Sequence, residues 1–138
     1  YYKAHQFDTT RLYPNVKEIL EYFSHKPKAI ASNKSKELTV DCLGFFGIKK
    51  YFLKIVGPEE PGCLKPSSCQ VDIILKALGI KNEFAVMVGD MPIDVETCKF
   101  SKITCCAVTY GLGKLEDLKN SKPDFIVDDI IELKDIIE

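Results

Sequence analysis

The segment Val88-Gly89-Asp90-Met91-Pro92-Ile93-Asp94 is the most informative part of this 138-residue chain. It closes an apolar run, Phe84 to Val88, that does not alternate and therefore predicts a strand covered by helices on both faces. The strand runs into a glycine and then into two carboxylates four residues apart. If the loop turns into a helix, Asp90 and Asp94 can face one point, as paired oxygen ligands of Mg²⁺ do. A helix-capping role for a carboxylate is the alternative interpretation.

Helical and extended patterns alternate on both sides of this segment. Apolar spacing predicts helices over 14–24, 35–46, 67–78, 115–120 and 130–137, and strands over 28–31, 51–56, 103–109 and 125–127. Such alternation is typical of βαβ units, which form a parallel sheet. We therefore expect an α/β fold, a Rossmann-like three-layer sandwich with a mostly parallel sheet.

Composition excludes several classes of protein. Nineteen basic and twenty acidic residues leave a formal net charge of -1, whereas a dedicated nucleic-acid binder is strongly basic. No apolar run approaches the roughly 20 residues that a membrane span needs. None of the six cysteines has the two-residue spacing of a zinc or thioredoxin-like motif, so we expect free thiols in a reducing cytoplasm.

Three more motifs lie in loops next to predicted strands and helices, where an α/β fold binds its ligands. Ser32-Asn33 follows a strand, and a hydroxyl, an amide and free N–H groups before a helix favour a phosphate, although both residues are also ordinary helix caps. Lys65-Pro66 can hold an ammonium toward the same crevice, since ligands bind beyond the carboxyl ends of parallel strands. A surface lysine is the alternative. Gly111-Leu112-Gly113 predicts a turn that lines the site.

The order of these motifs resembles the haloacid dehalogenase-like (HAD) superfamily, closest to its phosphoglycolate phosphatase-like hydrolases, from about residue 11 to the end. The resemblance implies that Ser32 binds the transferring phosphoryl group and that the backbone of Asn33 helps to cradle it. It implies that Lys65 stabilises the charge of that group and of the nucleophile. Asp90 would ligate Mg²⁺, with Asp94 in support.

The sequence departs from this family at its start. Members begin with a strand ending in Asp-x-Asp-Gly-Thr, whose first Asp is the nucleophile that forms an aspartyl-phosphate. Phe7-Asp8-Thr9-Thr10 is only superficially similar, because Lys3-Ala4-His5-Gln6 before it is too polar for a buried parallel strand. We expect residues 1–13 to be a return segment from a missing cap domain, and residues 14–138 to be the C-terminal portion of the HAD-like core, incomplete at its N-terminus.

In the family, the nucleophile strand lies between the strands that carry the Ser-Asn and Gly-Asp motifs. Without it, unpaired backbone edges would face the protein interior, a state that proteins avoid. We therefore expect one of two arrangements. Either a missing N-terminal segment or an oligomer partner lies beside these residues, or the strands over 28–31 and 84–88 pair directly.

The resemblance implies a Mg²⁺-dependent phosphomonoester hydrolase that acts on a small phosphorylated metabolite through a nucleophile outside this sequence. The 138 residues alone would then be inactive. A phosphomutase of the same superfamily and a non-catalytic module that binds phosphate and Mg²⁺ are the alternatives. A receiver-like signalling domain shares the α/β pattern but carries an early acidic pair that this sequence lacks.

Overall fold

The computed structural model describes residues 15–59 and 63–137, and it confirms the α/β fold. The helices are α2 (Val16–Tyr22), α3 (Lys36–Phe45), α4 (Cys69–Leu78), α5 (Pro92–Ser101), α6 (Leu115–Ser121) and α7 (Leu133–Ile136). The strands are β1 (Ala29–Ala31), β2 (Lys54–Val56), β3 (Val86–Gly89), β4 (Thr104–Val108) and β5 (Phe125–Val127). Short 3-10 helices are η1 (Lys49–Tyr51), η2 (Asn82–Phe84) and η3 (Ile130–Glu132). The predicted return segment, residues 1–13, and with it Asp8, lies outside the described residues.

Local sequence signals set the ends of several helices. The Ser35 hydroxyl accepts a hydrogen bond from the N–H of Leu38 at 3.2 Å and so caps α3. Gly79 has a φ of 66°, a left-handed conformation that suits glycine and ends α4. Pro92 occupies the first turn of α5, where its missing N–H costs no hydrogen bond.

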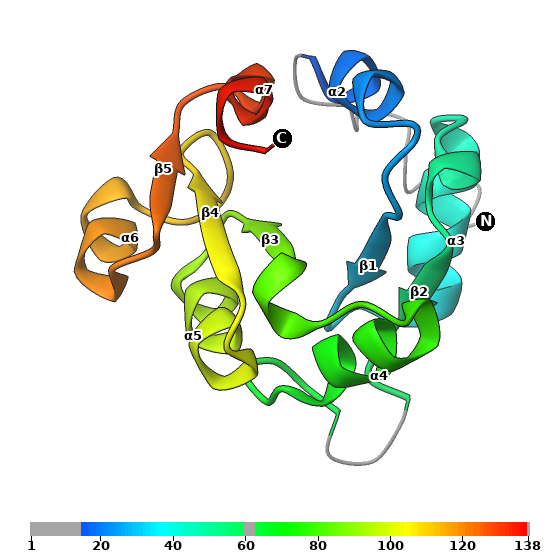
Figure 1. Ribbon diagram of the computed structural model, residues 1–138, viewed down its shortest axis with the longest axis horizontal. Helices are drawn as coiled ribbons and strands as arrows, with labels where there is room; N and C mark the ends of the chain where they lie inside the picture. Colours follow the sequence, from blue (N-terminus) through cyan, green and yellow to red (C-terminus); the bar gives the residue numbers. More distant parts are fainter. Residues whose placement is uncertain (1–14, 60–62, 138) are drawn as a thin grey trace, which may run out of the picture.

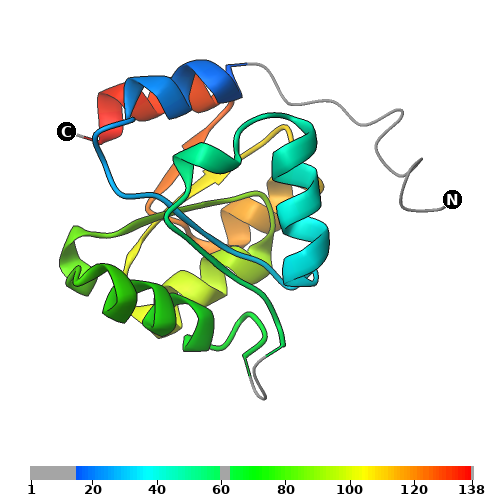
Figure 2. The same ribbon diagram turned by 90° about the vertical axis from the view of Figure 1, so that its right-hand side faces the viewer.

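The strands form two separate parallel sheets. One sheet has the order β1-β2, and the other has the order β3-β4-β5. All the pairings among the described strands are parallel. Figures 1 and 2 show α2 and α7 on one side of the strands and α4 and α5 on the other, which gives three layers. Direct pairing of β1 with β3, one of the two expected arrangements, is not what the structure has.

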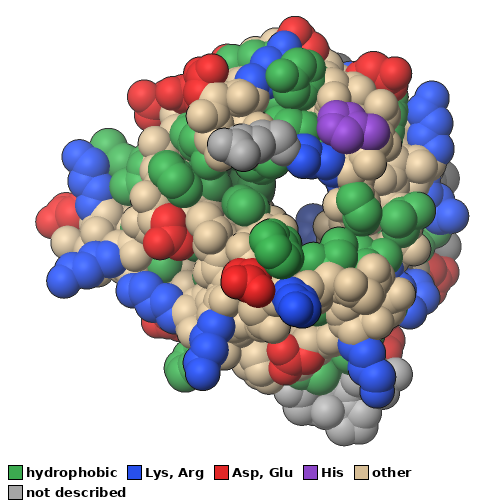
Figure 3. All heavy atoms as spheres, viewed as in Figure 1, with side chains coloured by type: hydrophobic (Ala, Val, Ile, Leu, Met, Phe, Trp, Pro, Cys, Tyr) green, Lys and Arg blue, Asp and Glu red, His purple; other side chains and the backbone are tan. Residues whose placement is uncertain are grey.

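An opening separates the two sheets. It is visible through the space-filled molecule in Figure 3, between the positions of β1 and β3 in Figure 1. On β3, Met87 packs against the cluster that joins α5 to β4. Val86 and Val88 point to the opposite face, and each is 38% exposed. The described residues therefore leave this strand less buried than its continuous apolar sequence predicts, because β3 has a partner strand on one side only.

Helix α2 connects the two sheets. Ile19 of α2 and Phe23, the residue that caps its C-terminus, pack into a cluster with buried residues of β4, β5 and α7, which are Cys106, Val108, Val127 and Leu133. Leu20 belongs to a second cluster with Leu43, Ile48 and Ile55, around the β1-β2 sheet. The parts of the molecule around the β1-β2 sheet and around the β3-β4-β5 sheet are its two halves. One turn of α2 thus contributes to both cores, and burial of its apolar side chains holds the halves together.

The buried cysteines behave as expected, with one exception described below. Cys98, Cys105 and Cys106 are free and buried. A hydrogen bond with Cys98 raises the pKa of the Cys105 thiol, and burial raises it further. Burial raises the pKa of the Cys106 thiol to about 11, so this group stays protonated at neutral pH. In the part of the chain that the structure describes, no helix is long and apolar enough to cross a membrane.

We predict that Phe23→Ala lowers the free energy of unfolding by about 3 kcal/mol, because it removes a buried aromatic ring from the cluster that joins the halves. Urea denaturation followed by circular dichroism measures this. Phe84→Ala is the matched control, since Phe84 is 76% exposed, and we expect a change below about 0.5 kcal/mol. Equal losses in the two variants would contradict the role of α2.

Candidate active site

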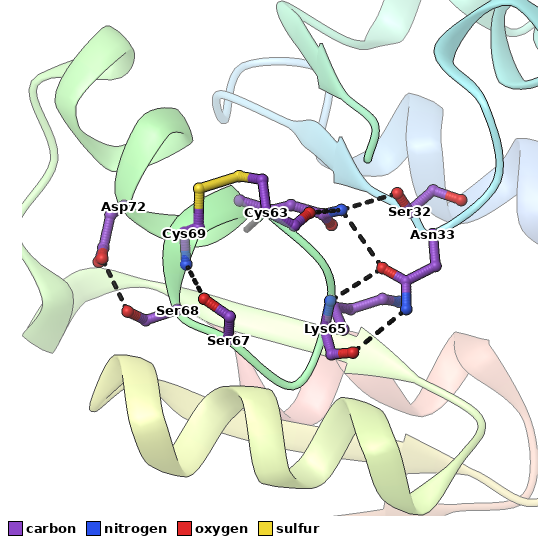
Figure 4. Close-up of a disulfide and its surroundings, with 9 residues drawn as sticks. Ser32, Asn33, Cys63, Lys65, Ser67, Ser68, Cys69 and Asp72 are labelled. Atoms are coloured by element: carbon purple, nitrogen blue, oxygen red, sulfur yellow. Dashed lines mark hydrogen bonds between the residues drawn. A yellow bond between two sulfur atoms is a disulfide. The ribbon is translucent and has the colours of Figure 1, made fainter. Parts of the chain in front are cut away.

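The structure brings the loops after β1, before α4 and after β3 together. These loops carry Ser32-Asn33, Lys65 and Asp90, which sequence analysis predicted as site residues. Figure 4 shows the first two loops side by side. The third is joined to them through the Lys65 side chain, as described below.

The Ser32 loop is separate from the cap of the following helix. Ser32 is half-buried, and its N–H donates to the carbonyl of Val56 at 3.1 Å, which extends the β1-β2 pairing. Its hydroxyl accepts from the N–H of Lys34 at 3.0 Å. Because Ser35 caps α3, the alternative interpretation of Ser32 and Asn33 as the helix caps does not hold.

Asn33 binds the main chain of Lys65 through both ends of its side-chain amide, an arrangement that we call a clasp. Its Oδ1 accepts from the N–H of Lys65 at 2.9 Å, and its Nδ2 donates to the Lys65 carbonyl at 3.3 Å (Figure 4). The prediction for Asn33 concerned its backbone, which nothing here tests. The structure adds a side-chain function, because the clasp fixes the loop that carries the lysine.

The Lys65 ammonium reaches across to α5. Its Nζ lies 2.7 Å from Asp94 Oδ1, and the two side chains are 13% and 6% exposed. Asp94 Oδ2 accepts from the N–H groups of Asp90 at 3.1 Å and Met91 at 3.2 Å. Asp94 therefore holds both the ammonium and the loop after β3, while its predicted support of a metal stays a prediction.

Asp90 is fixed by the turn that follows β4. The N–H of Leu112 donates to Asp90 Oδ2 at 2.9 Å, and the N–H of Gly113 donates to the Asp90 carbonyl at 3.1 Å. A Cβ added at Gly111 would lie 2.3 Å from the Cβ of Asp90, closer than any side chain tolerates. The turn thus lines the site as predicted, and its first glycine permits the close approach to Asp90.

The donor set at Asp90 suits a cation that is shared with a substrate. Mg²⁺ usually takes one or two protein carboxylates and fills its other positions with water and phosphate oxygens. Among residues 15–59 and 63–137, no group of three or more His, Cys, Asp or Glu side chains is placed to hold a metal ion. The carboxylate of Asp90 has the hard oxygen donors that such a shared ion takes from a protein.

Two features of the site escaped the sequence analysis. Cys63 and Cys69 form a disulfide with a Cα–Cα distance of 5.0 Å, and it encloses Lys65, so the expectation of free thiols is wrong for this pair. Their spacing matches no motif, and the pairing arises because the loop before α4 turns back on itself. The second feature is Gln70, a fully buried polar residue of α4 that binds both neighbouring loops.

We predict that the double variant Cys63→Ser, Cys69→Ser unfolds with a free energy about 2 kcal/mol below that of the oxidised wild type, because the open loop regains conformational entropy on unfolding. Urea denaturation measures the difference, which should vanish when both proteins are measured with reductant. Alkylation of the denatured, unreduced wild type should label four cysteines, Cys42, Cys98, Cys105 and Cys106. Labelling of all six would contradict the disulfide.

We predict that Gly111→Ala lowers the free energy of unfolding by about 2 kcal/mol, because its methyl group would force the turn away from Asp90. The NMR signal of the Leu112 amide should shift as its hydrogen bond to Asp90 is lost. Gly44→Ala is the matched control, since nothing lies within 4 Å of its added Cβ in α3. That substitution should stabilise the protein by up to about 1 kcal/mol.

Known proteins similar to this chain belong to the family that its motifs resemble. Residues 1–108 match the family model described as haloacid dehalogenase-like hydrolase. A Caldanaerobacter subterraneus protein, provisionally named pyrophosphatase PpaX, is 33% identical over 134 residues, which are 94% of this chain and 60% of the relative. Phosphoglycolate phosphatase of Vibrio parahaemolyticus is 28% identical over 139 residues, which are 99% of this chain and 61% of the relative.

A crystal structure provides the same assignment. A predicted phosphoglycolate phosphatase from Haemophilus somnus superposes with a TM-score of 0.91 at 28% identity, over 98% of this chain and 61% of that one. The chain thus spans about three fifths of the length of these relatives. The matches confirm the resemblance drawn from the motifs, and the chain belongs to the haloacid dehalogenase-like hydrolases, an enzyme family, in the vicinity of its phosphoglycolate phosphatases.

Proposed function

We propose that this chain is the phosphate-binding and metal-binding portion of a Mg²⁺-dependent phosphatase that hydrolyses a small phosphomonoester. The observation that carries the proposal is the position of Lys65: its ammonium lies 2.7 Å from Asp94, and its main-chain N–H is held by Asn33 of the Ser32 loop. A lysine held between two loops at the carboxyl ends of parallel strands is placed to bind an anion there.

Each residue then has a distinct task. Ser32 and Lys65 bind the transferring phosphoryl group, with the hydroxyl as hydrogen-bond partner and the ammonium as counter-charge. The backbone N–H of Asn33 is a further donor to the phosphoryl group, and its side chain keeps Lys65 in place. Asp90 holds Mg²⁺, with Asp94 in support. When bound, the ion neutralises phosphoryl oxygens and orients the attack on phosphorus.

The nucleophile in this proposal is an aspartate outside the 138 residues. It would be carried on a strand that enters the opening between the sheets, contributed by an N-terminal segment or by an oligomer partner. The support is that β1 and β3 each have a partner strand on one side only among the described residues, and that the opening lies between them. A strand placed there would satisfy both backbone edges.

Relatives suggest which substrates to test first. Those compared above are named for phosphoglycolate in two cases and for pyrophosphate in one. Both compounds present a terminal phosphoryl group to a compact cationic site. We favour phosphoglycolate, and pyrophosphate serves as the competing substrate.

The decisive experiment compares two proteins, the 138 residues alone and the same residues joined to the sequence encoded upstream of Tyr1. We expect Mg²⁺-dependent release of phosphate from phosphoglycolate by the longer protein, and none by the shorter one. In the longer protein, Asp90→Asn should lower kcat/KM by at least about 100-fold, because the carboxylate that holds Mg²⁺ is lost. Release of inorganic phosphate is measured colorimetrically, with and without EDTA.

Asp117→Asn is the matched control for this prediction, since Asp117 is exposed on α6 and should leave turnover unchanged. Equal turnover by the short and long proteins would contradict a nucleophile outside the 138 residues. Phosphate binding without turnover in both proteins would support the non-catalytic binding module instead. Transfer of the phosphoryl group between sugar hydroxyls would support the mutase.

A further inference from the structure

Gln70 is a polar residue at the start of α4 with no exposed surface. Burying a side-chain amide is costly unless hydrogen bonds replace those made to water. The NH₂ group of Gln70 faces three oxygens. It donates to the carbonyl of Ser32 at 2.8 Å, to the carbonyl of Cys63 at 2.8 Å and to Asn33 Oδ1 at 3.3 Å. Since all three partners are acceptors, only the nitrogen of the amide can face them.

These contacts tie together the two loops that the hydrogen bonds between Asn33 and Lys65 also join. Ser32 and Cys63 belong to different loops, and Gln70 binds a main-chain carbonyl in each. The third contact orients the amide of Asn33, which in turn clasps the main chain of Lys65. A continuous series of hydrogen bonds therefore runs from Gln70 through Asn33 to Lys65.

Only the NH₂ end of this amide is satisfied by the residues that the structure describes. The Oε1 of Gln70 is buried and has no hydrogen-bond partner among the described residues. An unsatisfied buried carbonyl is destabilising, whereas an apolar side chain of the same shape would instead leave the carbonyls of Ser32 and Cys63 without their donor. The amide is useful because it specifies where the two loops lie relative to each other.

We propose that Gln70 is a positioning residue, which sets the spacing of Ser32 and Lys65 so that the hydroxyl and the ammonium address one phosphoryl group. This inference rests on the proposed function for its consequence, and on the hydrogen bonds of Gln70 for its geometry. Gln70 acts through Asn33 and the main chain, and it does not touch the substrate.

The test uses Gln70→Met, which keeps the length of the side chain and removes its donors. Two properties of the 138-residue chain are measured. The first is the affinity for inorganic phosphate, by titration calorimetry in the presence of Mg²⁺, and we expect it to fall about tenfold. The second is acetylation of Lys65 by a soluble succinimidyl ester, with exposed Lys114 as internal reference. Lys65 labelling should rise about tenfold as its loop loosens.

Leu133→Ala is the control for general destabilisation, because Leu133 is buried in α7 and belongs to the cluster around α2. It should lower the melting temperature without changing either readout below the transition. Should Gln70→Met fail to fold, Gln70→Asn is the second variant. That variant keeps an amide but is one methylene too short to bind both loops, and it should give the same two changes.

Wild-type phosphate affinity and wild-type Lys65 protection in a folded Gln70 variant would overturn the inference. The two readouts separate it from the proposed function. If the wild-type chain binds no phosphate, the proposed function loses its support, while the labelling of Lys65 still decides whether Gln70 positions the loop. Unchanged labelling in that case rejects the positioning role as well.

Discussion

The ion pair between Lys65 and Asp94 is the interaction that makes one site out of two halves. Lys65 precedes α4, which packs on β1 and β2, whereas Asp94 lies on α5, which packs on β3 and β4. Removing both groups from water is costly, and the N–H groups of Asp90 and Met91 offset part of this cost by binding the second carboxylate oxygen. Such a pair contributes geometry more than stability, since it fixes the distance between the loops that would address a phosphate.

The same pair defines the opening between the sheets. Helix α2 joins the halves through Ile19, Leu20 and the residue that caps its C-terminus, Phe23. The Lys65–Asp94 contact joins them through a second, polar connection. Between these two connections, β1 and β3 do not pair. Unpaired edges are ordinarily protected from contact with other strands. An arrangement that holds two parallel edges apart with defined connections is suited to receiving a strand between them.

The helices and strands of this chain are well predicted by its sequence, whereas the contacts between them are not. Apolar periodicity located the described strands and most of the helices to within a few residues, because it is a property of short segments. It set no bounds for α5. The spacing of Asp90 and Asp94 indicated only a loop that could turn into a helix, and that helix begins at Pro92, so it contains Asp94 but not Asp90. The clasp of Asn33 on Lys65 joins residues 32 positions apart, and Gln70 reaches Ser32 across 38 positions. No periodic pattern records such pairs, since they depend on how the loops fold back.

Strands β3 and β4 show most clearly how a local sequence pattern differs from the contacts that a strand makes in the fold. Both strands have continuous apolar sequences, and for both the pattern predicts burial. In β4, which lies between β3 and β5, Cys106 and Val108 are 0% and 6% exposed. In β3, which has a partner on one side, Val86 and Val88 are each 38% exposed. The apolar sequence of β3 is typical of a strand with a neighbour on each side, and among the described residues β3 has one neighbour, β4. The exposure of these two valines therefore points to a strand position on the open side of β3. This observation does not depend on any sequence motif.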